Sequence, residues 1–243
     1  MPLSFDGRER RRIYLFRHGD VAYLNPDGTR VPDSRLVNLT PKGEAEADTK
    51  AEIFRSVSID RAVSSGLPRT RQTAERVLRH HDLPIEDRPA FEEIRSNRRG
   101  PLDIAELERV AYAFADAHHP DARYGNGERF ADFEARVLGG LMALLAEPGW
   151  QRLALFAHGG VNRIVIGWAL GAGLVAFGRL EQDTCCVNVI DVDQEADGSV
   201  RRTIVRAVNV TASDPLKADR SLTTLETMAM RYRSLLEAGR SGG

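Results

Sequence analysis

One short pattern occurs twice in the chain and constrains the fold more than any other feature. Residues 12–19 read RIYLFRHG and residues 152–159 read RLALFAHG, so each copy is an apolar, strand-like run that ends in His-Gly. In open α/β sheets, ligands bind beyond the carboxyl ends of parallel strands, close to the N-termini of the helices that follow. The pattern therefore predicts that His18 and His158 lie at one edge of a single sheet.

The rest of the chain alternates between strand-like and helix-like segments. Such alternation is typical of an α/β fold with a largely parallel sheet. Strands are expected at residues 13–16, 61–64, 153–157, 187–192 and 203–208, and helices are expected to begin near Thr40, Leu67, Leu102, Phe130, Gly160 and Leu222. Asp197 and Gly198 lie between the last two strands and favour a hairpin connection there.

Length and charge narrow the class of protein. The chain has 243 residues and no segment typical of a linker, which favours one domain over residues 1–243, with a core at about 11–212 and a helical tail at about 213–243. The 34 lysine and arginine residues are balanced by 35 aspartate and glutamate residues. Chains that bind nucleic acid through bulk charge are usually strongly basic, so we expect no nucleic-acid partner.

The cysteines and the apolar segments indicate in which cellular compartment the protein is expected. Cys185 and Cys186 are adjacent, and two cysteines are too few and too close for a disulfide framework or a zinc site. The apolar run at 164–178 is shorter than the roughly 20 residues that a membrane span needs and contains Gly171 and Gly173, which favours a buried helix and a turn. No signal-like apolar segment precedes the first expected strand. We therefore expect a cytoplasmic protein without a membrane partner.

A third strand end adds positive charge to the edge that carries the two histidines. Residues 62–75 (AVSSGLPRTRQTAE) predict a strand, a turn and a helix, with Arg69 in the first helical turn. Helix N-termini favour anions, and an arginine there adds fixed hydrogen-bond donors. With Arg17, these residues form a cationic group in a chain of net charge -1, which indicates an anionic ligand, most simply a phosphate. The four other histidines form two adjacent pairs and are expected to be solvated.

Arg17-His18-Gly19 resembles the Arg-His-Gly signature of the histidine phosphatase superfamily, which has the phosphoglycerate mutase-like fold. Further segments resemble the family's motifs in the same order along the chain: Leu39-Thr40 with Gly43 and Ala47, residues 64–69 with 72–75, Phe91-Glu92-Glu93-Ile94, Gly127-Glu128 with Phe130 and Arg136, and Ala157-His158-Gly159-Gly160. The resemblance implies a three-layer α/β/α sandwich with a mostly parallel central sheet.

The resemblance also implies a mechanism. His18 would attack phosphorus and carry the phosphoryl group until water releases phosphate, while Arg17, Arg69 and His158 would bind the phosphate oxygens. Glu93 would protonate the leaving alcohol and then deprotonate the attacking water, since a carboxyl beside a phosphate is expected to have a raised pKa. Glu92 is the rival for this role, and the register relative to Ile94 favours Glu93. Neither a metal ion nor a cofactor would be required.

Several positions depart from the family pattern. Val21 offers no hydroxyl, and Leu24 replaces an asparagine that often contacts phosphate; Asn25 is one position late, so that role is not transferred to it. Arg95, Arg98 and Arg99 follow the expected acid, where they either extend the cationic rim toward a second anionic group of the substrate or form a solvated loop.

Three functions fit these features. The first is a metal-independent phosphomonoesterase that hydrolyses a small phosphorylated metabolite. The second is a phosphoglycerate mutase-type phosphotransferase, although the 65 positions between Glu93 and His158 (158 − 93 = 65) are fewer than such mutases typically have. The third is a non-catalytic phosphate-binding regulatory module, against which the intact His18, Glu93 and His158 argue.

Substrate specificity is expected to depend on the segments that match the family least. These are residues 23–38 and 109–129. The tail at 221–239 predicts an amphipathic helix, which either packs on its own domain or contributes a contact in a homodimer.

Overall fold

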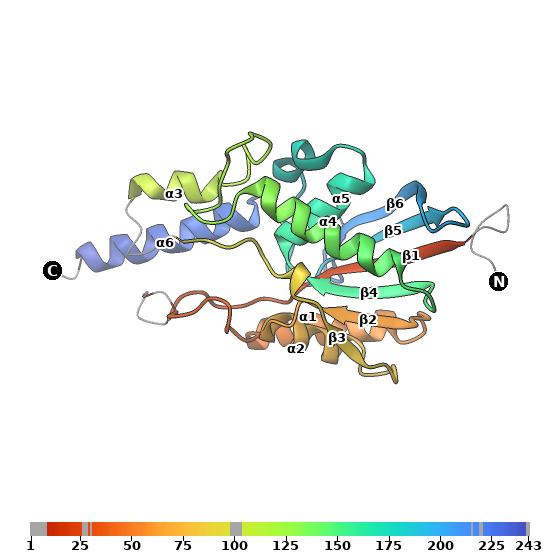
Figure 1. The fold of residues 1–243 in the computed structure, drawn as a ribbon. Coiled ribbons are helices and arrows are strands. Elements are labelled where there is room, and N and C mark those ends of the chain that lie inside the picture. The colour runs from red at the N-terminus through yellow and green to blue at the C-terminus, as the bar shows by residue number, and fades with distance from the viewer. Residues whose placement is uncertain are drawn as a thin grey trace.

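The computed structural model describes residues 9–25, 29, 31–97, 104–214, 216–218 and 221–241. Its elements in chain order are β1 (Arg10–Arg17), α1 (Pro41–Phe54), β2 (Arg61–Ser64), α2 (Pro68–Val77), β3 (Ile85–Asp87), the 3-10 helix η1 (Pro89–Phe91), α3 (Ile104–Ala111), α4 (Phe130–Ala146), β4 (Arg152–Ala157), α5 (Gly159–Ala169), the 3-10 helix η2 (Gly173–Arg179), β5 (Val187–Gln194), β6 (Val200–Val210) and α6 (Thr224–Ser241). Figure 1 shows their arrangement.

The six strands form one mixed sheet in the order β3-β2-β4-β1-β5-β6. The pairs β3/β2, β2/β4 and β4/β1 are parallel, whereas β5 and β6 run antiparallel to their neighbours. Strands β1 and β4 pair so that Arg12 lies opposite Arg152 and Arg17 opposite Ala157. The two copies of the repeated pattern therefore lie side by side in register, as the sequence predicts.

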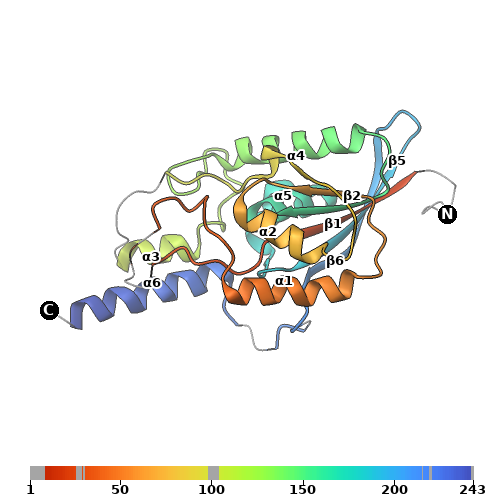
Figure 2. The ribbon, with the colours of Figure 1, turned by 90° about the horizontal axis from the view of Figure 1, so that it is seen from below.

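Helices cover both faces of the sheet, which gives the expected three layers (Figures 1 and 2). On one face, α4 and α5 pack on the strands; on the other, Ala47 and Phe54 of α1 and Ala74 and Val77 of α2 pack against Phe156 and its neighbours. Alternate side chains of a strand point to opposite faces, so the near-continuous apolar runs of β1 and β4 supply both cores.

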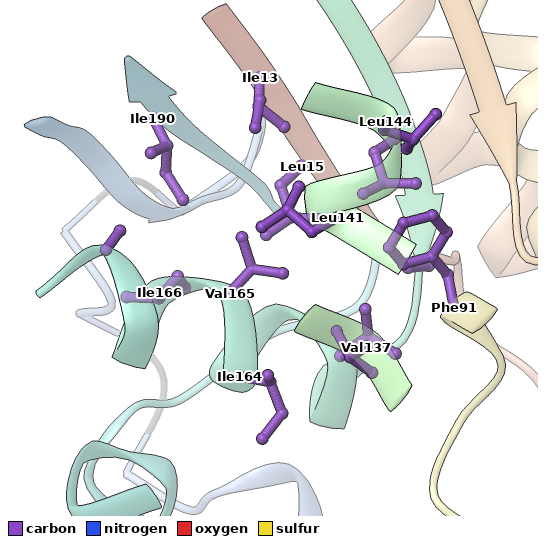
Figure 3. Packing of buried hydrophobic residues seen from close by; sticks show 14 of the residues in the cluster. Ile13, Leu15, Phe91, Val137, Leu141, Leu144, Ile164, Val165, Ile166 and Ile190 are labelled. Atoms are coloured by element: carbon purple, nitrogen blue, oxygen red, sulfur yellow. The ribbon is translucent and has the colours of Figure 1, made fainter. Parts of the chain in front are cut away.

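The larger core lies between the sheet and the helices α4 and α5. Figure 3 shows Ile13 and Leu15 of β1 facing Val137 and Leu141 of α4 and Val165 of α5. All five side chains are fully buried. This packing fixes the N-terminal end of α5 directly after β4, and so fixes the chain on both sides of His158.

A smaller apolar cluster joins α3 and the C-terminal helix α6, which lie side by side at one end of the molecule (Figures 1 and 2). It contains Leu107 and Val110 from α3 and Ala229 and Tyr232 from α6. The predicted tail helix is thus present, and it packs on its own chain. No helix among the described residues is long and apolar enough to cross a membrane.

The expected strands and helices are present, with differences at their ends and one omission. Strand β1 begins at Arg10 rather than residue 13, because Arg10 pairs with Asp193 of β5 through the backbone register and an ion pair of 2.6 Å. Strand β3 was not predicted: it has three residues and none is buried, so it lacks an apolar pattern. The apolar run at 164–178 forms the end of α5 and most of η2, with a turn at Gly171, whose φ is +67°.

Candidate active site

The two histidines of the repeated pattern come together at the carboxyl ends of β1 and β4. The backbone N–H of His18 donates to the carbonyl of Ala157 over 3.1 Å, which continues the pairing of the two strands by one residue. The imidazole centroids of His18 and His158 are 5.3 Å apart, with the rings inclined at 64°. Both side chains are buried.

His18 is held in one tautomer. Its Nδ1 lies 2.7 Å from the carbonyl oxygen of Gly19, and because a carbonyl only accepts, the ring proton is on Nδ1. Burial lowers the pKa of His18 well below its ordinary value, and the nearby Arg69 and Arg17 charges lower it further. The ring is therefore neutral at neutral pH, and Nε2 carries a lone pair.

His158 is oriented by a serine at the end of β2. Its Nε2 lies 2.9 Å from Oγ of Ser65, and that oxygen in turn lies 2.8 Å from Oγ1 of Thr70 in α2. Burial lowers the pKa of His158 well below its ordinary value, and the positive charge of Arg69 lowers it further. The Ser65 side chain belongs to a motif that the sequence singles out, but its contact with His158 follows only from the pairing of β2 with β4.

The structure brings Arg17 and Arg69 to the same place. Arg17 donates through Nη1 to the carbonyl of Gln182 and to Oγ1 of Thr224, and Arg69 donates through Nη1 to the carbonyls of Ser34 and Arg35. Both guanidinium groups are almost fully buried. The Nε atoms of Arg17 and Arg69 and the Nδ1 atom of His158 are buried without a hydrogen-bond partner in the described part of the chain.

Glu93 lies at the N-terminus of α5. Its carboxylate accepts a hydrogen bond of 3.1 Å from the backbone N–H of Gly160 and one of 3.0 Å from its own neighbour Ile94. A Cβ atom on Gly160 would lie well inside van der Waals contact with Glu93 Oε1, so only glycine allows this approach. Glu92 lines the same cavity as Glu93, but its carboxylate forms ion pairs with Arg35 at 2.8 Å and Arg95 at 3.4 Å.

A cavity of about 950 Å³ lies beside these residues. Arg17, Arg69 and Glu93 contribute to its surface, whereas His18 and His158 are not among its lining residues and each adjoins one, Arg17 and Gly159, in the chain. The volume is in the range of small-molecule sites. Of the three arginines after the acid, Arg95 is exposed and lines the cavity; Arg98 and Arg99 lie outside the described residues.

Sequence reasoning missed three polar residues beside the site. Arg163 in α5 is buried; it donates to the carbonyl of Leu180 and pairs with Glu181 at 3.2 Å. Glu181 also accepts a hydrogen bond of 2.6 Å from the hydroxyl of Thr224, the first residue of α6. Arg163 follows His158 by five positions, which is neither of the spacings of three and four residues at which helical side chains are neighbours, and no local pattern connects residue 224 with the site.

The positions that depart from the family pattern have structural roles. Val21 is buried and bridges to Leu39, and Leu24 packs against the cluster between α3 and α6. The side chain of Asn25 donates to Thr29, and Asn25 is not among the residues that line the cavity.

Comparison with known proteins identifies the family. The model of the histidine phosphatase superfamily (branch 1) matches residues 13–204. A 2-carboxy-D-arabinitol-1-phosphatase from Triticum aestivum is 27% identical over 225 residues, which are 88% of this chain and 43% of that protein. A broad-specificity phosphatase from Saccharomyces cerevisiae is 30% identical over 165 residues, 65% of this chain and 69% of that protein. The chain spans less than half the length of the plant relatives it matches.

Solved structures agree on the fold. A mycobacterial glucosyl-3-phosphoglycerate phosphatase superposes with a TM-score of 0.68 at 24% identity, covering 83% of this chain and 99% of that one. A phosphoglycerate mutase from Bacillus anthracis superposes with a TM-score of 0.66 at 18% identity, covering 88% and 98%. The family model covers most of the chain, and the chain belongs to the histidine phosphatase superfamily.

Proposed function

We propose that the protein is a metal-independent phosphomonoesterase that hydrolyses a small phosphorylated metabolite through a phosphohistidine on His18. One observation carries the proposal: three buried nitrogens, Arg17 Nε, Arg69 Nε and His158 Nδ1, have no partner in the described part of the chain. A buried polar group without a partner costs about 1–3 kcal/mol. A phosphate group offers several strong acceptor oxygens at once, and it would satisfy all three.

In the first step, Nε2 of His18 attacks phosphorus and the bond from phosphorus to the ester oxygen breaks. The neutral tautomer set by Gly19 supplies the lone pair for this attack. Arg17 and Arg69 hold the equatorial oxygens and offset the charge of the transferring group. Glu93, as the protonated acid, gives its proton to the leaving alkoxide, so that the alcohol departs neutral.

In the second step, water attacks the phosphorus of phosphohistidine. Glu93, now a carboxylate, accepts a proton from the water, and the nitrogen–phosphorus bond breaks. Inorganic phosphate leaves and His18 returns to its neutral form. Glu93 is preferred to Glu92 for both proton transfers, because the carboxylate of Glu92 is paired with the guanidinium groups of Arg35 and Arg95, whereas the carboxylate of Glu93 accepts backbone hydrogen bonds from Gly160 and Ile94.

His158 binds phosphate in this scheme as a neutral ring. When the hydroxyl of Ser65 donates to Nε2 of His158, the ring proton is on Nδ1, and this N–H can donate to a phosphate oxygen. No step requires a metal ion or an organic cofactor, because His18 is the nucleophile and the two arginines neutralise the phosphate.

The phosphate is the part of the substrate that the proposal specifies. The relatives are named for different phosphorylated substrates: 2-carboxy-D-arabinitol 1-phosphate for the wheat protein and glucosyl-3-phosphoglycerate for the mycobacterial one. We also propose a reducing compartment such as the cytoplasm, since Cys185 and Cys186 are buried free thiols.

The test is a panel of phosphate monoesters incubated with wild type and with His18→Ala, in the presence of a chelator, with free phosphate as the readout. We expect release by the wild type that is insensitive to chelator and absent from the variant. Activity that survives His18→Ala, or that the chelator removes, would refute the assignment. Isomerisation of phosphoglycerate without release would support the mutase alternative, and phosphate binding without turnover would support a regulatory module.

A further inference from the structure

The cavity surface carries apolar side chains as well as charged ones. The candidate phosphate site, with Arg17, Arg69 and Glu93, forms one part of its surface. Another part is apolar and is formed by a set of side chains that we call the apolar wall. The apolar wall consists of Val110, Phe114, Leu225, Met228 and Tyr232. A phosphate monoester has the same two parts, a charged phosphate and the group that leaves with the alcohol.

Four members of the apolar wall lie on α3 and α6, which pack on each other outside the main core, whereas Phe114 follows α3 and packs against the main core. Val110 of α3 and Tyr232 of α6 belong to the cluster between these helices, and Met228 packs against it. Leu225, Met228 and Tyr232 are spaced by three and four residues, so they lie on one face of α6. Figures 1 and 2 both show α6 running along α3. The face that α6 presents to α3 therefore also faces the cavity.

The start of α6 is joined to the phosphate site. Thr224 Oγ1 accepts a hydrogen bond of 3.2 Å from Arg17, and its hydroxyl donates to Glu181 over 2.6 Å. Glu181 also pairs with Arg163, whose guanidinium lies 5.0 Å from the ring centre of Phe114 in the apolar wall. These contacts fix the distance between the apolar wall and the arginine that would bind phosphate.

The rise per residue of an α-helix gives the distance along α6 between Thr224 and the residues of the apolar wall. At 1.5 Å per residue, Met228 lies about 6 Å and Tyr232 about 12 Å along α6 from Thr224. A leaving group that reaches Met228 must therefore extend about one ring beyond the phosphate. A small polar alcohol such as glycerol would leave these side chains in contact with water.

We infer that α6 is a specificity element of the active site, which selects phosphate monoesters whose alcohol carries an apolar, ring-sized group, through Met228 and its neighbours in the apolar wall. The inference rests on the proposed phosphatase function. Burial of the ring against the wall removes apolar surface from water, which favours these esters over small ones.

Two alkyl esters test this preference without a difference in leaving-group chemistry. 2-Phenylethyl phosphate and ethyl phosphate both release a primary alcohol, so a difference in kcat/KM reports binding of the phenyl ring. We expect the wild type to favour the phenyl ester by about tenfold or more, which is the discrimination that a small apolar group gives in an enzyme pocket. Met228→Ala is expected to lower kcat/KM for the phenyl ester about fivefold and to change that for ethyl phosphate less than twofold.

The same helix supplies a matched control. Met230 is 50% exposed and does not line the cavity, so Met230→Ala should leave both esters unaffected. Retained turnover of ethyl phosphate shows that Met228→Ala is folded. Equal kcat/KM for the two esters in the wild type, or an equal loss for both in Met228→Ala, would overturn the inference while leaving the phosphatase function intact. Failure of the wild type to release phosphate from any ester would refute the proposed function instead.

Discussion

The imidazoles of His18 and His158 lie with their ring centroids 5.3 Å apart because the two strands that precede them pair in register. Two residues separated by 140 positions (158 − 18 = 140) thus become neighbours through backbone hydrogen bonds alone. Each ring then receives a different partner, Gly19 for His18 and Ser65 for His158. The two histidines thus lie in different hydrogen-bonding environments, which suit the two roles we propose for them, nucleophile and phosphate ligand.

The contact between Ser65 and His158 can be tested with a neighbouring serine as control. Ser65→Ala removes the hydrogen bond that fixes the ring of His158, so we expect kcat for a phosphate monoester to fall about tenfold, in the range found when groups that orient a functional histidine are removed. Ser64 is equally buried and bonds to Thr70 but not to His158. Ser64→Ala should therefore lose stability without a comparable loss of kcat, and equal loss of kcat in both variants would contradict the role of Ser65.

Gly160 is predicted to be essential for the placement of Glu93. A methyl group in Gly160→Ala would collide with Glu93 Oε1 and displace the carboxyl, so we expect kcat to fall by about 100-fold, the scale of a lost general acid–base. Gly139 in α4 has open space around its Cβ position, and Gly139→Ala should keep full activity and stabilise the protein by roughly 0.5–1 kcal/mol. Full activity in Gly160→Ala would show that Glu93 is not the acid.

Thr224 is predicted to position Arg17. Thr224→Val keeps the shape of the side chain but removes the oxygen that accepts from Arg17 and the hydroxyl that donates to Glu181. Hydrogen bonds to charged groups contribute about 1.5–3 kcal/mol, so we expect KM for a phosphate monoester to rise about tenfold. Thr224→Ser retains the hydroxyl and should restore KM. A rise that serine does not reverse would indicate a packing effect rather than a hydrogen bond.

The sequence contained most of the information for the fold and for the five proposed site residues. The repeated pattern and the Asp-Gly pair are local signals, and the elements they predict are present. Strand β3 was not predicted because its three residues show no apolar pattern. They form a strand through their pairing with β2.

The contribution of α6 to the cavity could not be predicted from the sequence, because it also depends on tertiary contacts. The tail at residues 221–239 predicts an amphipathic helix, but an apolar face does not specify what it packs against. Thr224 meets Arg17 across 207 positions of sequence. Only the packing of α6 on α3 shows that Met228 faces the cavity, and the sequence offered the homodimer contact as an equal alternative.

Two buried neutral histidines should make the protein sensitive to acid. The pKa values of His18 and His158 are lowered in the folded protein, mainly by burial, so below the unfolded value of about 6.5 the unfolded chain binds more protons than the folded one. Their stabilising effect is complete above that pH and is lost as the pH falls toward the folded pKa values, by up to about 1.4 kcal/mol per pH unit for each ring.

Urea unfolding between pH 8 and pH 5.5 measures this effect. The free energy of unfolding of the wild type should fall more steeply below pH 6.5 than that of the double variant His18→Gln/His158→Gln. Parallel curves for the two proteins would mean that the histidines are not held neutral by the fold.

The proposed phosphohistidine on His18 can be tested directly by rapid acid-free quenching during turnover of an aryl phosphate, followed by peptide mass spectrometry. Because an aryl oxide leaves without a proton from Glu93, Glu93→Gln should slow mainly the hydrolysis of the intermediate, and we predict a phosphoryl group on His18 that accumulates in this variant and is absent from His18→Ala. Phosphate release by the wild type with no phosphoryl group on His18, or with the group on another residue, would contradict the mechanism.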